Sequence, residues 1–151
     1  MTDEINIRLG SLSDLNSIFN IEETVFLTES WSIKMIKLEF FKDLVSKSYV
    51  FELNGIVIGF AFTDILKYEV HLNRIAIDPN YQQNGFGFQL LKKILEENSI
   101  NKSVFLDLKY SNISALKLYK KVGFKEYNIR KKYYLNNCDA LLMCLKRKKL
   151  I

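Results

Sequence analysis

Apolar and polar residues alternate in several short runs of the chain, as at Ile5, Ile7 and Leu9, and this period of two predicts β-strands. The expected strands cover residues 5–9, 47–53, 56–66, 69–77, 103–109, 124–134 and 139–146. Four other segments repeat apolar residues every three or four positions, which predicts helices that bury one face. We expect them to begin after Ser13 and Ser32, at Gly85 and after Asn112, the last two ending near Asn98 and at Val122.

Residues with strong local preferences mark the ends of these elements. The serines before the first two helices, and Asn112 before the last, can accept hydrogen bonds from the first backbone N–H groups of a helix. Gly123 suits the left-handed position that ends a helix. Asn54-Gly55 predicts a tight hairpin turn, and Asn136-Asn137 is expected to join the last two strands.

The order of these elements, βααβββαβαββ, predicts an α+β fold with helices on both faces of a mostly antiparallel sheet of about seven strands. The helix from Gly85 must carry the chain back so that strand 103–109 pairs in parallel with strand 69–77. A ligand of this parallel pair is expected in the gap between Ile77 and Lys109, where the two strands end. Because no linker or internal repeat interrupts residues 1–151, we expect a single domain.

Composition and charge exclude several classes of protein. The 151 residues are 48% hydrophobic and 26% charged, a balance typical of globular proteins, and no run of eighteen apolar residues predicts a membrane span. The first residues lack the basic and apolar segments of a signal peptide, so we expect a cytoplasmic protein. The net charge of +5 suits an anionic coenzyme or a ribosomal surface, and the densest basic cluster, Lys146–Lys149, is interpreted as a solvated tail.

Cysteine and histidine are too few and too scattered for a metal centre. Cys138 and Cys144 fall on one expected strand without C-x-x-C spacing, and His71 is the single histidine. We therefore expect free thiols and no bound metal.

Residues 75–88 carry the clearest chemical signal. The apolar run Ile75–Ile77 ends at Asp78-Pro79, and after a polar loop Gly85 and Gly87 open a helix. A helix start exposes unpaired N–H groups and partial positive charge, which together bind phosphate, and glycine lets a ligand come close to the backbone. The third glycine of G-x-G-x-x-G and the G-K-[ST] of a P-loop are absent. The same glycines would also suit a tightly packed helix start without a ligand.

Two blocks of sequence resemble motifs of the GNAT family of N-acetyltransferases. Gln82-x-x-Gly85-x-Gly87 resembles the acetyl-CoA loop Q/R-x-x-G-x-G/A, and residues 107–124 resemble E-V-x-x-x-N…A-x-x-L-Y-x-x-x-G-F. The resemblance implies the GNAT fold and acetyl-CoA as co-substrate. The expected coenzyme-binding residues are Ile75, Ala76, Ile77, Gln82, Gln83, Asn84, Gly85, Phe86, Gly87, Phe88 and Asn112.

Three residues are candidates for proton transfer. The resemblance makes Tyr119 the acid that protonates the departing coenzyme sulfur, although a tyrosine at this helical position also suits the core. Asp107 is the candidate base for the acceptor amine, or else a paired carboxylate at the sheet edge; the ribosomal-protein alanine N-acetyltransferases of this family have the longer glutamate there. A water relay, or Glu69 on the neighbouring strand, is the alternative base.

Further motifs resemble this ribosomal-protein subfamily. Trp31-Ser32 resembles its F-x-x-P-W-S element, with Ser30 in place of proline, and residues 130–143 resemble R-x-x-Y-Y…D-A-x-x-M. The resemblance implies that Trp31, Tyr133 and Tyr134 line a peptide groove, and that a ribosomal protein's N-terminal alanine is acetylated by direct transfer. An α-amine of pKa about 8 is compatible with a weak base, unlike lysine near 10.4.

Two other functions fit parts of the sequence. The same fold could acetylate a small amine such as a polyamine or an antibiotic. The basic tail and the aromatic residues would also suit a non-enzymatic RNA or ribosome binder, but no RNP-type motif is present, and we expect no requirement for nucleic acid.

Overall fold

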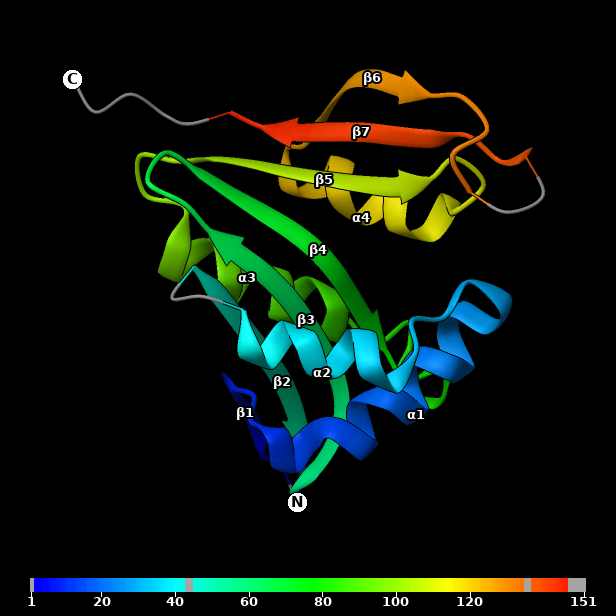
Figure 1. Cartoon of the computed structure of the whole chain (residues 1–151). Coiled ribbons are helices and arrows are strands. Elements are labelled where there is room, and N and C mark those ends of the chain that lie inside the picture. The colour runs from blue at the N-terminus through cyan, green and yellow to red at the C-terminus, as the bar shows by residue number, and fades with distance from the viewer. Residues whose placement is uncertain (1, 43–44, 135–136, 147–151) are drawn as a thin grey trace.

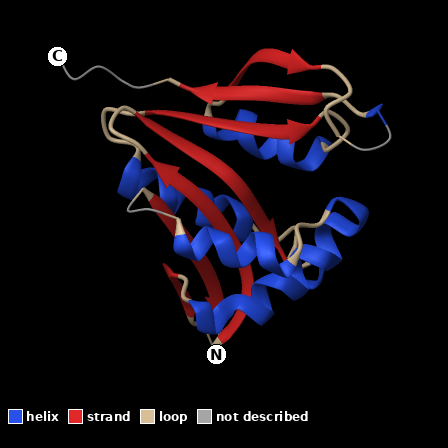
Figure 2. Cartoon of the chain, viewed as in Figure 1, coloured by secondary structure: helices blue, strands red, loops and turns tan. Residues whose placement is uncertain are grey.

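A seven-stranded sheet with four α-helices makes up the fold, seen in a computed structural model that describes residues 2–42, 45–134 and 137–146 (Figures 1 and 2). The strands are β1 (Ile5–Leu9), β2 (Ser46–Leu53), β3 (Ile56–Ile65), β4 (Glu69–Ile77), β5 (Ser103–Lys109), β6 (Lys125–Arg130) and β7 (Ala140–Leu145). The helices are α1 (Leu15–Phe26), α2 (Ile33–Phe41), α3 (Phe86–Asn98) and α4 (Ile113–Val122). No helix in the described ranges has the length and apolar character needed to cross a membrane.

The strands lie in the order β1-β2-β3-β4-β5-β7-β6, and every neighbouring pair is antiparallel except β4 and β5. This confirms the predicted fold class, the element order and the single parallel pair. α3 connects the parallel strands, as a crossover between parallel neighbours requires.

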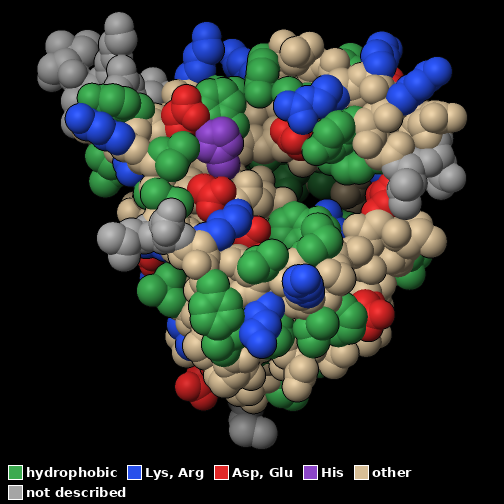
Figure 3. Space-filling model, viewed as in Figure 1, with side chains coloured by type: hydrophobic (Ala, Val, Ile, Leu, Met, Phe, Trp, Pro, Cys, Tyr) green, Lys and Arg blue, Asp and Glu red, His purple; other side chains and the backbone are tan. Residues whose placement is uncertain are grey.

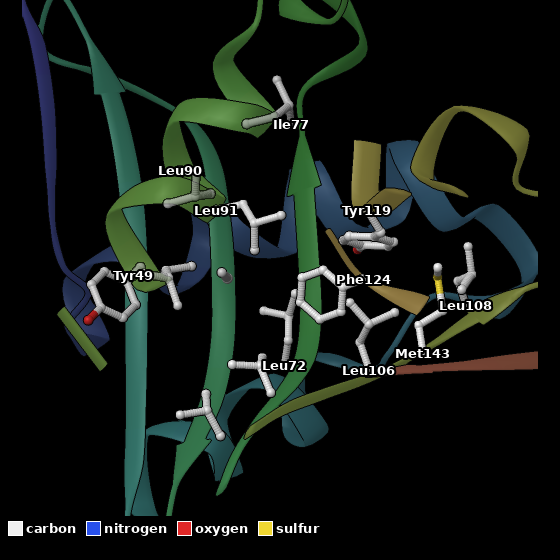
Figure 4. Packing of buried hydrophobic residues seen from close by; sticks show 14 of the residues in the cluster. Tyr49, Leu72, Ile77, Leu90, Leu91, Leu106, Leu108, Tyr119, Phe124 and Met143 are labelled. Carbon is white, nitrogen blue, oxygen red and sulfur yellow. The ribbon is translucent and has the colours of Figure 1, made fainter. Parts of the chain in front are cut away.

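Helices cover the two faces of the sheet unequally. α3 and α4 pack on one face through a large apolar cluster that includes Leu90, Leu91 and Tyr119 (Figure 4). α1 and α2 bury Ile18 and Ile36 on the opposite face, against residues of β2, β3 and β4. On that second face no helix of the described chain covers β5, β7 or β6 (Figure 1).

The sheet opens where β4 and β5 part (Figure 1). The two strands pair from Glu69 opposite Ser103 to Leu72 opposite Leu106, and then separate. Opposite β3 the register of β4 skips Asn73, so a β-bulge lies where the pairing with β5 stops. Beyond it β4 continues along β3 and β5 along β7, which confirms the predicted gap between their ends.

Most predicted boundaries are confirmed by their hydrogen bonds. The Ser32 hydroxyl accepts from the Met35 N–H at 3.2 Å, and the Asn112 side chain accepts from the Ala115 N–H at 3.2 Å. Asn54-Gly55 turns the β2–β3 hairpin with positive φ at both residues, and Gly123 ends α4 at φ 116°.

The start of α1 was predicted wrongly. A 3-10 turn over Leu12–Asp14 precedes the helix, and Ser13 does not cap it. Instead the Asp14 carboxylate accepts from the Ser11 N–H at 2.9 Å and from Arg8, which also binds Glu52. The cap moves because these ion pairs tie the turn to the β1–β2 edge.

The last two strands are shorter than predicted. β6 ends at Arg130, so Tyr133 and Tyr134 lie in the following turn, and Cys138 precedes β7 instead of sharing a strand with Cys144. The Lys132 N–H donates to the Asp139 carboxylate at 2.9 Å, which closes the turn early. Asn136 and Arg147–Lys149 lie outside the described residues.

Candidate active site

A cleft of about 1470 Å³ lies where the sheet opens, and it hollows the face seen in Figure 3. Its walls are the diverging ends of β4 and β5, the starts of α3 and α4, the α1–α2 connection and the turn after β6. Every predicted site residue lines this cleft except Asn84. The Asn84 amide donates instead to the carbonyls of Tyr81 and Gln82, both at 3.1 Å, so this side chain shapes the loop.

The loop before α3 presents backbone N–H groups at the open end of β4. Gln82 donates to the Ile77 carbonyl at 2.9 Å and so folds the loop back on the strand. Gly85 is the N-cap residue, at φ 78°, and no side chain caps the helix. The first intrahelical donor is Gln89, bonded to the Gly85 carbonyl at 3.1 Å. The three preceding N–H groups are therefore available to an anion.

Gly87 leaves room above the first turn of α3. A methyl group built at this position would meet Leu118 at 3.6 Å and Ile77 at 3.8 Å, which are ordinary contact distances. Packing within the chain thus does not require glycine here. A ligand lying against the backbone would require it.

Tyr119 is buried beside this loop. Its ring packs against Phe124 with 5.7 Å between centroids, and its residual exposure is 5% (Figure 4). Burial, with a smaller contribution from Tyr134, raises the pKa of the Tyr119 phenol well above its usual value. The hydroxyl therefore keeps its proton at neutral pH and can donate it.

The two candidate bases lie at different ends of the cleft. Asp107 is exposed near the open end of β5, and the bulkier Leu106 and Leu108 point to the opposite face. Burial and the charge of Asp107 raise the pKa of Tyr134 to about 12. Glu69 lies at the paired end of β4, opposite Ser103, where it contacts His71 at 2.8 Å. Asp107 is four residues after Ser103, so the two candidate bases are about 13 Å apart along the strand direction.

Arg74, which the sequence did not single out, holds the α1–α2 connection against β4. It makes a bidentate pair with Glu22, which is fully buried, and donates to the Glu29 carbonyl at 3.0 Å. Its guanidinium lies 3.5 Å from the Phe26 ring centroid and 4.8 Å from that of Trp31. A charged residue within each of two apolar segments was a signal that could have singled out Glu22 and Arg74 individually, though not their pairing.

Trp31 and the tyrosine pair form opposite walls of the cleft. The Trp31 ring stacks on Phe62 at 6.0 Å, and the Trp31 backbone N–H donates to the Glu22 carboxylate at 3.0 Å. Tyr133 and Tyr134 contact each other edge to face at 5.1 Å. Lys109 of β5 reaches Glu29 of the facing wall at 3.1 Å, which closes one side.

Asn112 uses its amide oxygen to cap α4, so that atom is committed to the helix. Among the described residues no group of three or more His, Cys, Asp or Glu side chains lies close enough together to hold a metal ion. Cys138 and Cys144 are not joined by a disulfide.

The chain is similar in sequence to proteins of one family. Residues 13–124 match the model of the "Acetyltransferase (GNAT) family". The ribosomal protein bS18 alanine N-acetyltransferase of Escherichia coli is 36% identical over 97 residues, which are 61% of this chain and 66% of that enzyme. An N-alpha-acetyltransferase of Sulfurisphaera tokodaii is 30% identical over 155 residues, covering 93% of this chain and 92% of that protein.

A solved structure extends the likeness to nearly the whole chain. The crystal structure of the Escherichia coli ribosomal-protein-S18-alanine N-acetyltransferase superposes with a TM-score of 0.90 and 28% identity, covering 98% of this chain and 97% of that one. The fold and the sequence therefore point to the same family.

Proposed function

Because the chain belongs to the acetyltransferase (GNAT) family, we propose that it is an acetyl-CoA-dependent N-acetyltransferase that acts on the N-terminal alanine of a ribosomal protein. The observation that carries the proposal is the uncapped start of α3, with its bare N–H groups, at the open end of β4 beside Tyr119. We also propose that residues 1–151 form one domain and act in the cytoplasm.

The coenzyme diphosphate would bind the backbone N–H groups at the start of α3. Gly85 and Gly87 allow its close approach, and the helix dipole favours its negative charge. The Ile75–Ile77 backbone lies at the sheet opening and could donate to the thioester oxygen as negative charge develops there.

Acetyl transfer would be direct. The acceptor amine attacks the thioester carbon and its C–N bond forms as the C–S bond breaks. Asp107, directly or through water, takes the ammonium proton, and Tyr119 gives its proton to the leaving sulfur. An α-amine of pKa about 8 requires only a weak base, a role that either carboxylate could fill. The position of Asp107 near the open end of β5 favours it over Glu69, which lies at the paired end of β4.

The relatives support an N-terminal acceptor. A bacterial ribosomal-protein alanine acetyltransferase and an archaeal N-alpha-acetyltransferase both resemble this chain. A small amine is the second candidate, because Glu29, Glu39, Glu69 and Asp107 place carboxylates along the cleft, as a polyamine would require.

The test is acetylation of a synthetic peptide with the mature N-terminus of the ribosomal protein bS18, followed by mass spectrometry. We expect one acetyl group on the α-amine, and none on the same peptide with a formylated N-terminus. Calorimetry should detect acetyl-CoA binding. Acetylation of spermidine alone would favour the second candidate, and absence of both coenzyme binding and acetylation would refute the proposal.

A further inference from the structure

Three aromatic rings lie side by side on the open face of the sheet, away from the proposed reaction centre. His71 of β4 and Phe105 of β5 are register partners whose rings stack with 5.5 Å between centroids. Tyr127 of β6 meets Phe105 edge to face at 6.0 Å. All three line the cleft, and Tyr127 is 53% exposed. We call these three residues the aromatic platform.

Carboxylates lie on two sides of the aromatic platform. Glu69 contacts the His71 ring at 2.8 Å and keeps about 45% of its side chain exposed. Asp107 lies two residues after Phe105 on the same face of β5, close enough for its charge to act on Tyr127. In Figure 3 acidic side chains lie beside the purple histidine. Rings with carboxylates at their edges attract cations.

A buried, unsatisfied carboxylate lies farther along the same cleft. Glu39 lines the cleft with only 8% of its side chain exposed, and it pairs with Lys42 through one oxygen. Its other oxygen is buried and has no hydrogen-bond partner among the described residues, and the same is true of one oxygen of Asp64. Asp64 lines a neighbouring pocket and shares Lys42 with Glu39, so negative charge exceeds positive charge within this group of three side chains beside the cleft.

The distances suit an extended peptide whose first residue is at the reaction centre. Phe105 precedes Asp107 by two residues, about 7 Å, and Glu69 lies at a level about 13 Å away. An extended chain advances about 3.4 Å per residue, so the third side chain of a peptide that runs from Asp107 toward Glu69 would lie over the aromatic platform.

We infer that the aromatic platform is an acceptor subsite that binds a positively charged side chain, preferably arginine, at the third residue of the substrate. The inference rests on the proposed function and specifies its substrate class. The planar guanidinium can stack on the exposed Tyr127 ring, which stands at 84° to the Phe105 ring, while pairing with Glu69, a combination that lysine matches less well.

Two peptides that differ by one charge test this inference. Both begin with alanine and are otherwise identical, but one has arginine at position three and the other has citrulline, its neutral isostere. We expect kcat/KM to be about tenfold higher for the arginine peptide. Equal values would overturn the inference while leaving the proposed function intact; acetylation of neither peptide would refute both.

Substitutions locate the preference on the molecule. Glu69→Gln and Phe105→Leu should each bring the arginine-to-citrulline ratio toward one, mainly by raising KM for the arginine peptide. Glu96→Gln, on an exposed side chain of α3, is the matched control and should keep the ratio. If the arginine-to-citrulline ratio were unchanged in both Glu69→Gln and Phe105→Leu, the inference would be overturned. An equal loss for both peptides in Glu69→Gln would remove Glu69 from the subsite and assign it to proton transfer.

Discussion

Tyr119 illustrates how the surroundings of one residue set its chemistry. Its phenol is buried and retains its proton, and no described residue forms a hydrogen bond with the hydroxyl. We expect Tyr119→Phe to lower kcat at least about a hundredfold, because the leaving thiolate loses its proton donor. Calorimetry should give an unchanged acetyl-CoA affinity. Unchanged turnover would exclude Tyr119 from the mechanism.

Arg74 should contribute strongly to the free energy of unfolding, because it holds the α1–α2 connection against β4. Arg74→Met would leave Glu22 as an uncompensated charge in a fully buried position, at a cost of about 3–5 kcal/mol in the free energy of unfolding. Urea titration measures this loss. Arg130→Met is the control, since the residue is exposed, and it should change the unfolding free energy little.

Individual site residues were predicted to different extents from the sequence. Asp107 could be placed on the sheet face opposite to that of Leu106 and Leu108, because successive side chains of a strand point to alternate faces. Arg74 and Glu22 could not be paired, because 52 residues separate them and neither has a local signal for the other. Ion pairs between distant segments depend on tertiary packing that single-sequence patterns do not contain.

At the scale of elements, substitution by alanine should affect stability differently at Gly59 and Gly87, the two glycines that lie close to Ile77. Gly87→Ala adds a methyl group at ordinary contact distances and favours the helix, so stability should hold or rise by up to about 1 kcal/mol. Acetyl-CoA affinity should fall about tenfold or more, because the methyl group occupies the space above the turn. Calorimetry and thermal unfolding of the same variant separate the two effects.

Gly59→Ala is the matched contrast. A methyl group there would lie 2.5 Å from Ile77 and 3.0 Å from the Ala76 carbonyl, so the β3–β4 pair must shift and the melting temperature should fall. If Gly87→Ala lowered the melting temperature as much as Gly59→Ala, Gly87 would be required for packing within the chain and not for binding the ligand.

Element types and order were predictable because long apolar periods and cap residues are local signals. β4 and β5 have the predicted bounds, and Ser32 and Asn112 cap the predicted helices. Boundaries failed where a group outside the element intervened, as at Ser13, where Arg8, itself paired with Glu52, draws Asp14 into a 3-10 turn. The bulge at Asn73, which opens the sheet, has no mark in the sequence either.

For the whole molecule, the buried tyrosines predict a loss of stability at high pH. Burial raises the pKa of Tyr49 and Tyr119, and raises that of Tyr134 to about 12. In the unfolded chain tyrosine ionises near pH 10. Between these values the unfolded chain releases protons that the folded protein retains, so unfolding becomes easier as pH rises above about 10.

The stability contribution of these tyrosines is complete below pH 10 and decreases above it by about 1.4 kcal/mol per pH unit for each fully buried phenol. Urea midpoints at pH 9, 10 and 11 measure the decline. Tyr119→Phe should show a shallower decline than the wild type. Tyr110→Phe, at a side chain that is 54% exposed, should follow the wild type.

The opening in the sheet also determines whether both substrates are bound when the acetyl group is transferred. α3 and its glycine loop lie on one face of the sheet and the aromatic platform on the other. Acetyl-CoA and the acceptor peptide can therefore approach from opposite faces and be bound at the same time. Neither cysteine lines the cleft, which leaves no thiol there to carry the acetyl group between half-reactions. Double-reciprocal plots of initial rate should therefore give intersecting lines, the mark of a ternary complex, whereas parallel lines would require an acetylated enzyme that this architecture does not provide.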